Sequence, residues 1–202
     1  MTGRFITFEG ADGSGKSTQA RLLAEALRRD GHTVIETREP GGTPLGEGIR
    51  ALLLDGDAID PVSEALLFAA ARAQHVRELI RPALERGDWV VCDRFLDSSI
   101  AYQGIARGLG ADVIDAVNAP AIDGLRPDLT IVLDVPVAVT IERRSGGPVD
   151  RIESEGDGFQ RTVADAFHDL ARRSPERITI VPGDASEEAV HAAVMDAVES
   201  MT

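Results

Sequence analysis

The sequence contains almost no cysteine: Cys92 is the only one among its 202 residues. A single cysteine excludes a disulfide within the chain, and its place in the apolar run WVVCD favours packing over reactivity. The histidines show no spacing typical of zinc ligands; they are His32, His75, His168 and His191. At this length a domain buries roughly 70% of its unfolded surface, so an apolar core can stabilise the fold without a metal or a disulfide.

Long apolar runs are also missing, since no stretch approaches the roughly 20 residues that cross a bilayer. The hydrophobic fraction of 43% and the charged fraction of 27% are typical of a soluble globular protein. The opening residues, MTGRFITFEG, continue into a strand pattern and lack the apolar core of a signal peptide. We therefore expect one cytoplasmic domain spanning residues 1–202.

Positive charge is scarce, because 21 Lys and Arg residues stand against 34 Asp and Glu residues, for a net charge of -13 at pH 7. Nucleic acids and anionic membranes require a basic face, so neither is expected as a partner. Only one of the basic residues is a lysine, Lys16, and it lies in the glycine-rich stretch EGADGSGKST. A small anionic ligand remains compatible with this composition if arginines gather around it.

Five short apolar segments alternate with helical patterns along the chain. They are interpreted as strands: RFITFE (4–9), HTVIET (32–37), WVVCD (89–93), LTIVLDV (129–135) and ITIV (178–181). The segment PGGTPLG (40–46) is interpreted as a turn after the second strand. Strands that alternate with helices predict a doubly wound α/β domain, in which a five-stranded parallel sheet is covered on both faces.

Three helices are indicated by apolar periodicity and by the residues at their ends. The first covers about residues 15–29. A long helix begins after Asp60 as its N-cap, and a kink is expected before Pro82. The C-terminal helix opens with Asp184 and Glu187, which have the spacing of a capping box.

Residues Gly10–Ser17 match the phosphate-binding pattern G-x-x-x-x-G-K-[ST], between a predicted strand and a predicted helix. Glycines let backbone N–H groups turn toward a phosphate, and the helix N-terminus adds positive partial charge. Lys16 then reaches the β- and γ-phosphates, while the Ser17 hydroxyl is placed to bind Mg²⁺. A glycine-rich turn without a ligand is the alternative interpretation. The candidate nucleotide-binding residues of this P-loop are Gly10, Ala11, Asp12, Gly13, Ser14, Gly15, Lys16, Ser17 and Thr18.

The P-loop motif does not by itself identify the reaction. A GTPase would need the guanine-reading tetrapeptide N-K-x-D, which a chain with a single lysine in its P-loop cannot contain. A helicase, transporter or motor ATPase would normally be longer or show nucleic-acid or membrane features. The small kinases remain, and they need a second phosphate site and arginines that close over the transferred group.

Six segments resemble thymidylate kinase, in the same order and with similar spacing from residue 4 to about residue 183. They are EGADGSGKST, TREPGGTPLGEGIR, LLFAAARAQH, CDRFLDSSIAYQG, RPDLTIVLDV and DRIE. The resemblance implies a homodimer that transfers the ATP γ-phosphate to dTMP with Mg²⁺, giving dTDP and ADP. Two alternatives stay open: another small P-loop kinase with a different nucleotide or nucleoside acceptor, and a nucleotide-binding module without catalysis.

A base-binding face is suggested by Phe68 and Arg72, which are four residues apart on one predicted helix. The ring could stack on a pyrimidine while the guanidinium binds its carbonyl edge, as the resemblance implies. Without the resemblance, a core phenylalanine beside an amphipathic arginine would be the simpler reading. The resemblance also implies that Ser99 and Gln103 lie near the base edge and that Tyr102 crowds the ribose 2′ position.

Asp93 and Arg94 end the third predicted strand, at the sheet edge where ligands bind in open α/β folds. The resemblance implies a water-mediated role for Asp93 at Mg²⁺. It also implies that Arg94 and Arg38 hold the acceptor phosphate, which a planar guanidinium can grip through two oxygens. Asp12 is implied to contact the acceptor sugar 3′-OH. Solvated loop residues are the alternative for Arg38, Arg94 and Asp12.

The variable P-loop positions, residues 11–14, carry no basic residue, so the charge that neutralises the transferred phosphoryl group must come from elsewhere. Residues 143–158 are glycine-rich and charged, and we expect a mobile lid there. The lid supplies Arg143, Arg144 and Arg151, which resembles the bacterial arrangement of the family. We favour Arg151 for the transferred group and Arg143 for ATP, and the choice among the three stays open.

Overall fold

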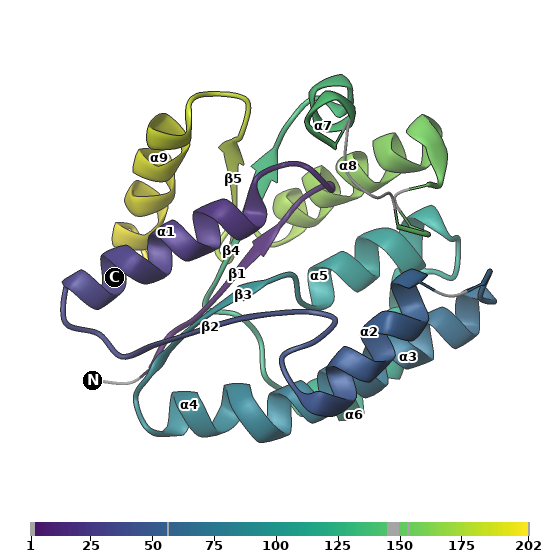
Figure 1. The fold of residues 1–202 in the computed structure, drawn as a ribbon, viewed down its shortest axis with the longest axis horizontal. Coiled ribbons are helices and arrows are strands. Elements are labelled where there is room, and N and C mark those ends of the chain that lie inside the picture. The colour runs from purple at the N-terminus through teal and green to yellow at the C-terminus, as the bar shows by residue number, and fades with distance from the viewer. Residues whose placement is uncertain (1–2, 56, 145–149, 153, 202) are drawn as a thin grey trace.

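The computed structural model describes residues 3–55, 57–144, 150–152 and 154–201. Five strands form one fully parallel sheet in the order β2-β3-β1-β4-β5 (Figure 1). The strands are β1 (Phe5–Glu9), β2 (Val34–Arg38), β3 (Trp89–Asp93), β4 (Leu129–Asp134) and β5 (Ile178–Pro182). The predicted five-stranded doubly wound sheet is therefore confirmed.

The central strands are apolar because helices cover both faces of the sheet. Every residue of β1 is buried, and so are the first five of β4. Thr7, Glu9 and Thr130 are polar residues among these buried positions, and the hydroxyls of Thr7 and Thr130 form a hydrogen bond to each other at 2.9 Å. This bond satisfies two polar groups that would otherwise be costly to bury.

One face of the sheet is covered by α1 (Lys16–Arg29) and α9 (Glu187–Glu199), which lie together on the same side in Figure 1. Leu23 of α1 and Val194 of α9 are fully buried in the same apolar cluster. The predicted capping box at the start of α9 is wrong. The helix begins two residues later than expected, so its N-cap is Ser186 and not Asp184. The Oγ of Ser186 accepts a hydrogen bond from the backbone N–H of Ala189 at 3.3 Å.

The opposite face carries the remaining large helices (Figure 1). The predicted long helix is present as α3 (Pro61–His75), the π-helical segment η1 (Val76–Ile80) and α4 (Arg81–Glu85). Asp60 caps α3, accepting from the Val62 N–H at 2.9 Å. The π-helical segment changes the hydrogen-bond pattern just before Pro82, where the kink was expected. Further along the chain lie α5 (Leu96–Ser99), η2 (Ile100–Ala106), α6 (Ala111–Ile122), α7 (Val137–Arg144) and α8 (Gly156–Arg173).

A helix absent from the prediction, α2 (Pro44–Asp55), begins inside the segment that was read as a turn. The turn reading is therefore wrong for its second half. Proline is well tolerated at the start of a helix, where its missing N–H has no intrahelical partner. Ile49 and Leu53 of α2 pack against Ala71 of α3, and this contact positions α2 beside the functional site.

Residues 145–149 and 153 of the expected lid lie outside the described residues. The described part includes Asp150–Ile152, in which Ile152 is only 7% exposed and packs with α8 and η2. The N–H of Arg151 bonds to the Leu54 carbonyl at 3.3 Å. Within the part of the chain that the structure describes, no helix is long and apolar enough to span a membrane.

Candidate active site

The P-loop connects β1 to α1, and two of its glycines are required by the geometry. Gly10 has φ +131°, and a Cβ there would lie 2.6 Å from the Leu133 carbonyl oxygen. Gly15 has φ +95° immediately before α1, a conformation that other residues rarely adopt. These glycines bring the backbone N–H groups and the N-terminus of α1 to one place, which forms an anion site.

Lys16 lies across this loop. Its Nζ donates to the Ala11 carbonyl at 2.7 Å and lies 3.4 Å from the Ser14 Oγ. Burial, followed by the charge of Arg94, lowers the pKa of the Lys16 ammonium to about 8. The loop without a ligand thus disfavours the charged form of Lys16. A bound phosphate anion would favour that form and raise the pKa again.

Ser17 and Asp93 provide oxygen atoms beside the loop, since the Ser17 hydroxyl donates to the Asp93 carboxylate. Hard cations such as Mg²⁺ prefer oxygen ligands, and Mg²⁺ commonly takes one or two from protein and the rest from phosphates and water. No cluster of three or more His, Cys, Asp or Glu side chains that could hold a metal occurs among the described residues. The donor set therefore fits Mg²⁺ that arrives with a nucleotide better than a metal held by the protein alone.

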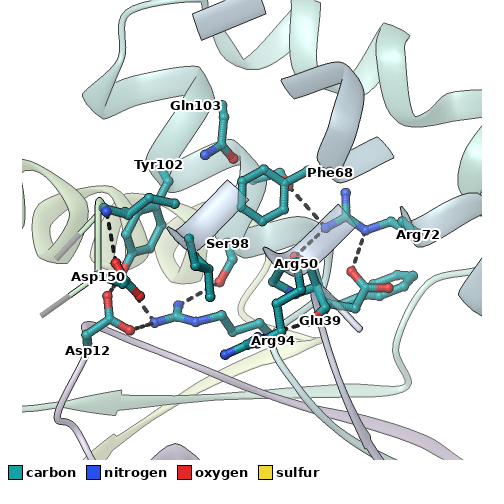
Figure 2. Close-up of a pocket in the computed structure, with 15 residues that line it drawn as sticks. Asp12, Glu39, Arg50, Phe68, Arg72, Arg94, Ser98, Tyr102, Gln103 and Asp150 are labelled. Atoms are coloured by element: carbon teal, nitrogen blue, oxygen red, sulfur yellow. Dashed lines mark hydrogen bonds and ion pairs between the residues drawn. The ribbon is translucent and has the colours of Figure 1, made fainter. Parts of the chain in front are cut away.

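Arg94 lies at the centre of the site, just after β3. Its backbone has φ 72°, an unusual conformation for a residue with a side chain, and its N–H bonds to the Phe8 carbonyl at 2.9 Å. Its guanidinium Nη1 donates to the Gly10 carbonyl at 3.1 Å and to the Ser98 Oγ at 3.0 Å. The guanidinium is thus held beside the P-loop (Figure 2).

Asp12 and Tyr102 hold Arg94 from the other side. Arg94 forms an ion pair with Asp12, and the Tyr102 hydroxyl donates to Asp12 Oδ2 at 3.2 Å. Burial alone would raise the pKa of Asp12, but the charges of Arg94 and Lys16 outweigh it and lower that pKa to about 2. Asp12 is therefore an ionised hydrogen-bond acceptor at neutral pH.

Glu9 is a buried carboxyl group that the sequence analysis did not identify. Its Oε1 accepts from the Phe95 N–H at 2.7 Å, and its Oε2 accepts from the Ser98 hydroxyl, which in turn contacts Arg94. Burial and the nearby charge of Asp97 raise the pKa of Glu9 to about 8. Its position near the end of an apolar strand suggested only a strand residue, because its partners come from residues 86 or more positions away.

The predicted base-binding pair, Phe68 and Arg72, lies together in the cavity shown in Figure 2. Arg72 is 1% exposed, and its guanidinium donates to Glu39 Oε2 at 2.8 Å, to Ser99 Oγ at 3.1 Å and to Asn118. These bonds fix the plane of the guanidinium. Arg72 is therefore a buried residue with fixed partners and also part of the cavity wall.

Fifteen residues line this cavity, and they come from the P-loop, the segments that follow β2 and β3, the helical elements α2, α3, α5 and η2, and residues 150–152. They are Asp12, Glu39, Pro40, Arg50, Leu54, Phe68, Arg72, Arg94, Phe95, Ser98, Ser99, Tyr102, Gln103, Asp150 and Ile152. The structure thus brings together seven of the eight residues that the sequence analysis placed at the acceptor. The exception is Arg38, which is half-exposed and pairs with Glu47 at 2.9 Å.

Arg50 is a cavity residue that the sequence analysis missed. It comes from α2, and its Nη1 donates to the Pro40 carbonyl at 3.0 Å. Burial, followed by the charge of nearby Arg38, lowers the pKa of Arg50. Cations near one another favour a bound anion. Recognising Pro44 as a helix start would have brought Arg50 to attention, since it lies in the same quoted segment.

The lid arginines occupy different places. Arg151 donates to Glu64 Oε2 at 2.6 Å and to the Leu53 carbonyl at 3.0 Å, so its guanidinium lies between α2 and α3. Arg143 donates to the Gly183 carbonyl at 3.1 Å, beyond the end of β5. The side chain of Arg144 lies outside what the structure describes.

A P-loop beside an arginine-rich cavity can hold two phosphorylated molecules next to each other. Asp12 belongs to both, since it is a P-loop residue and also lines the cavity. Together, the parallel sheet and this site define a small P-loop kinase of the type that phosphorylates nucleoside monophosphates.

Comparison with known proteins gives the family. A thymidylate kinase family model matches residues 8–194. A thymidylate kinase from Halothermothrix orenii is 53% identical over 196 residues, which cover 95% of this chain and 94% of that protein. Another, from Bradyrhizobium sp., is 49% identical over 202 residues, which cover 97% of this chain and 89% of that protein. The crystal structure of thymidylate kinase from Ehrlichia chaffeensis superimposes with a TM-score of 0.81 at 38% identity, over 98% of this chain and 99% of that one. The chain belongs to the thymidylate kinase family.

Proposed function

We propose that this protein transfers the γ-phosphate of ATP to dTMP, giving dTDP and ADP, with Mg²⁺ as the metal. The observation that carries the proposal is the ion pair between Asp12 of the P-loop and Arg94 of the cavity. This pair spans the boundary between a triphosphate site and a second anion site. A phosphoryl group can pass between two such sites only if they are adjacent.

The donor site consists of the P-loop N–H groups and Lys16, which would bind the β- and γ-phosphates of ATP. Ser17 would bind Mg²⁺ directly and Asp93 through water, and the metal would neutralise charge on the phosphates. Arg143, near the end of β5, is proposed to contact ATP, and we propose the same for Arg144.

The acceptor site places the dTMP phosphate against the cations. Arg94 would bind this phosphate through its guanidinium, and Arg38 would exchange its ion pair with Glu47 for a bond to the same phosphate. Arg50 would also contact the phosphate, because it lines the cavity. The ionised Asp12 would accept a hydrogen bond from the sugar 3′-OH. Tyr102 would exclude a 2′-OH by occupying the space beside the ribose.

At the other end of the cavity, Phe68 would stack on the thymine ring. Arg72 and Ser99 would bind its carbonyl edge, and Gln103 would bind beside them. All four line the same cavity wall. A pocket fitted to the 5-methyl group would gain only about 1–3 kcal/mol for thymine over uracil.

The chemistry needs no general base, because the attacking phosphate oxygen of dTMP is already ionised at neutral pH. That oxygen forms a bond to the γ-phosphorus as the bond to the β,γ-bridging oxygen breaks, and ADP leaves. The protein contributes position and positive charge. We propose that Arg151 supplies charge to the transferred group after leaving Glu64.

We also propose that the protein is a cytoplasmic, single-domain homodimer. Leu45 and Leu52 of α2 and Val62 and Leu66 of α3 are exposed large apolar side chains on two helices that pack together. Exposed apolar side chains on a pair of packed helices are compatible with a protein interface there. Sedimentation equilibrium tests this assignment, and a monomer at micromolar concentration would contradict it.

An acceptor panel tests the function. With ATP and Mg²⁺ in a coupled ADP-release assay, dTMP should give a higher kcat/KM than dUMP, dCMP or AMP, and removal of Mg²⁺ with EDTA should stop the reaction. Preference for AMP or dCMP would favour a small kinase with another acceptor. No turnover with any acceptor, together with measurable ATP binding, would favour a non-catalytic nucleotide-binding module.

The pKa of Lys16 leads to a pH dependence. Because only the charged ammonium attracts a triphosphate, and the pKa in the free protein is about 8, kcat/KM for ATP should fall above pH 8, approaching about tenfold per pH unit. Bound phosphate raises this pKa, so kcat at saturating ATP should fall only at higher pH. Rate profiles from pH 6.5 to 9.5 measure both, and a flat kcat/KM profile for ATP would contradict the role of Lys16.

A further inference from the structure

Glu64 is a fully buried carboxylate in the first turn of α3, behind the base end of the cavity. Three side chains donate to it. Its Oε1 accepts from Gln103 Nε2 at 2.8 Å and from Arg107 Nε at 3.2 Å, and its Oε2 accepts from Arg151 Nη2 at 2.6 Å. Glu64 does not line the cavity, but its partner Gln103 does.

The carboxylate determines which way the Gln103 amide faces. A carboxylate bonded to two guanidiniums only accepts hydrogen bonds, so it must meet the NH₂ side of the amide and not the carbonyl side. With its NH₂ group directed to Glu64, the amide turns its carbonyl Oε1 away from that carboxylate. In Figure 2 the Gln103 side chain points toward Phe68, the ring on which the base is proposed to stack. Gln103 is 1% exposed, so bulk water does not offer its amide an alternative partner.

We propose that Glu64 is a positioning residue for base selection, acting through Gln103. It presents the Gln103 carbonyl to the cavity as a fixed acceptor. Thymine and uracil carry an N–H donor at ring position N3, whereas cytosine carries a lone pair there. The same pocket therefore binds a thymine edge and repels a cytosine edge. This inference rests on the proposed function, since it concerns how the same acceptor site distinguishes pyrimidines.

Removing the charge tests the inference. Glu64→Gln can either accept from or donate to Gln103, so the amide loses its fixed direction while the side-chain volume is kept. The kcat/KM ratio of dTMP over dCMP should fall about tenfold, because a site built for one hydrogen-bonding pattern discriminates by such factors or more. The ratio of dTMP over dUMP should not change, since uracil has the same N3–H.

A double-mutant cycle isolates the route through Gln103. The double variant Glu64→Gln/Gln103→Ala should have the same kcat/KM ratio of dTMP over dCMP as the single variant Gln103→Ala. Arg107→Gln is the matched control, because it removes another partner of Glu64 without releasing the Gln103 amide, and it should keep the wild-type ratio. An equal effect of Glu64→Gln in both backgrounds, or no effect on the ratio, would overturn the proposal.

The proposed function and the role of Glu64 can fail separately. Wild-type protein that does not phosphorylate dTMP refutes the proposed function before any variant is compared. Wild-type protein that does so, with an unchanged ratio in Glu64→Gln, refutes only the role of Glu64. If Glu64→Gln does not fold by circular dichroism, Glu64→Asp keeps the charge but withdraws the carboxylate from Gln103. It should lower the same ratio, and an unchanged ratio would overturn the proposal.

Discussion

Lys16→Arg should lower kcat by about 10²–10³-fold although the charge is kept, since losing one aligned donor at a developing charge costs about that much. Lys16 is 6% exposed, and its ammonium is held 2.7 Å from the Ala11 carbonyl inside the loop. An ammonium is compact, whereas a guanidinium is planar and wider and needs room for a fork of donors. We therefore expect a guanidinium to displace the phosphates from a loop that accommodates an ammonium.

Steady-state kinetics with ATP and dTMP measure this effect, with Lys16→Met as the variant that removes the charge. The two variants should be similarly impaired, which would show that shape matters beyond charge. Arg21→Lys is a matched control on the same helix, because Arg21 is half-exposed and forms a surface ion pair with Glu25 at 2.8 Å. It should have wild-type activity. Lys16→Arg with more than half of wild-type kcat would contradict the proposed fit of the ammonium.

Arg151→Ala should raise the barrier to turnover by about 2–4 kcal/mol while leaving the affinity for ATP nearly unchanged, if the guanidinium meets the transferred phosphoryl group. In the structure this guanidinium is held by Glu64 and the Leu53 carbonyl. Reaching the phosphoryl group would therefore require these bonds to exchange for bonds to the nucleotide. The larger negative charge of the reacting phosphates favours that exchange.

The same substitution also leaves a buried carboxylate with fewer partners, so a control is essential. Arg107→Ala removes a different partner of Glu64 from a residue outside the lid. If both substitutions slow turnover equally, Arg151 acts through Glu64 and not on the phosphate. Near-normal turnover in Arg151→Ala would move the role to Arg143 or Arg144. Thermal denaturation of each variant separates a loss of folding from a loss of rate.

Local patterns made much of the fold predictable. The strands and the P-loop are encoded by neighbouring residues, so apolar runs and the spacing of Gly10, Gly15 and Lys16 were sufficient. Asp60 was recognised as a cap for the same reason. The helix α2 was missed because Gly41 and Gly42 indicated a turn, and the predicted turn included Pro44, where the helix in fact begins. The family resemblance, and not periodicity, supplied most of the acceptor residues.

The supporting charges could not be predicted, because their partners are distant in sequence. Glu39 contacts Arg72, 33 positions away, and Glu64 contacts Arg151, 87 positions away. Each is an unremarkable acidic residue in its own segment. Their importance comes from burial, which makes an unpaired charge costly and so ties each carboxylate to a guanidinium that lines or approaches the site.

The lone lysine has a practical consequence for chemical labelling. Lys16 is the only source of a side-chain amine in the chain, and its pKa of about 8 leaves much of it neutral and nucleophilic in mildly alkaline buffer. An amine-reactive reagent small enough to enter the loop can therefore modify one side chain. The α-amine of the chain reacts in the same pH range, so peptide mapping by mass spectrometry would report the added mass on the Lys16 peptide separately. A nucleotide seated in the loop would shield that amine. The extent of labelling thus becomes a direct gauge of P-loop occupancy, independent of turnover.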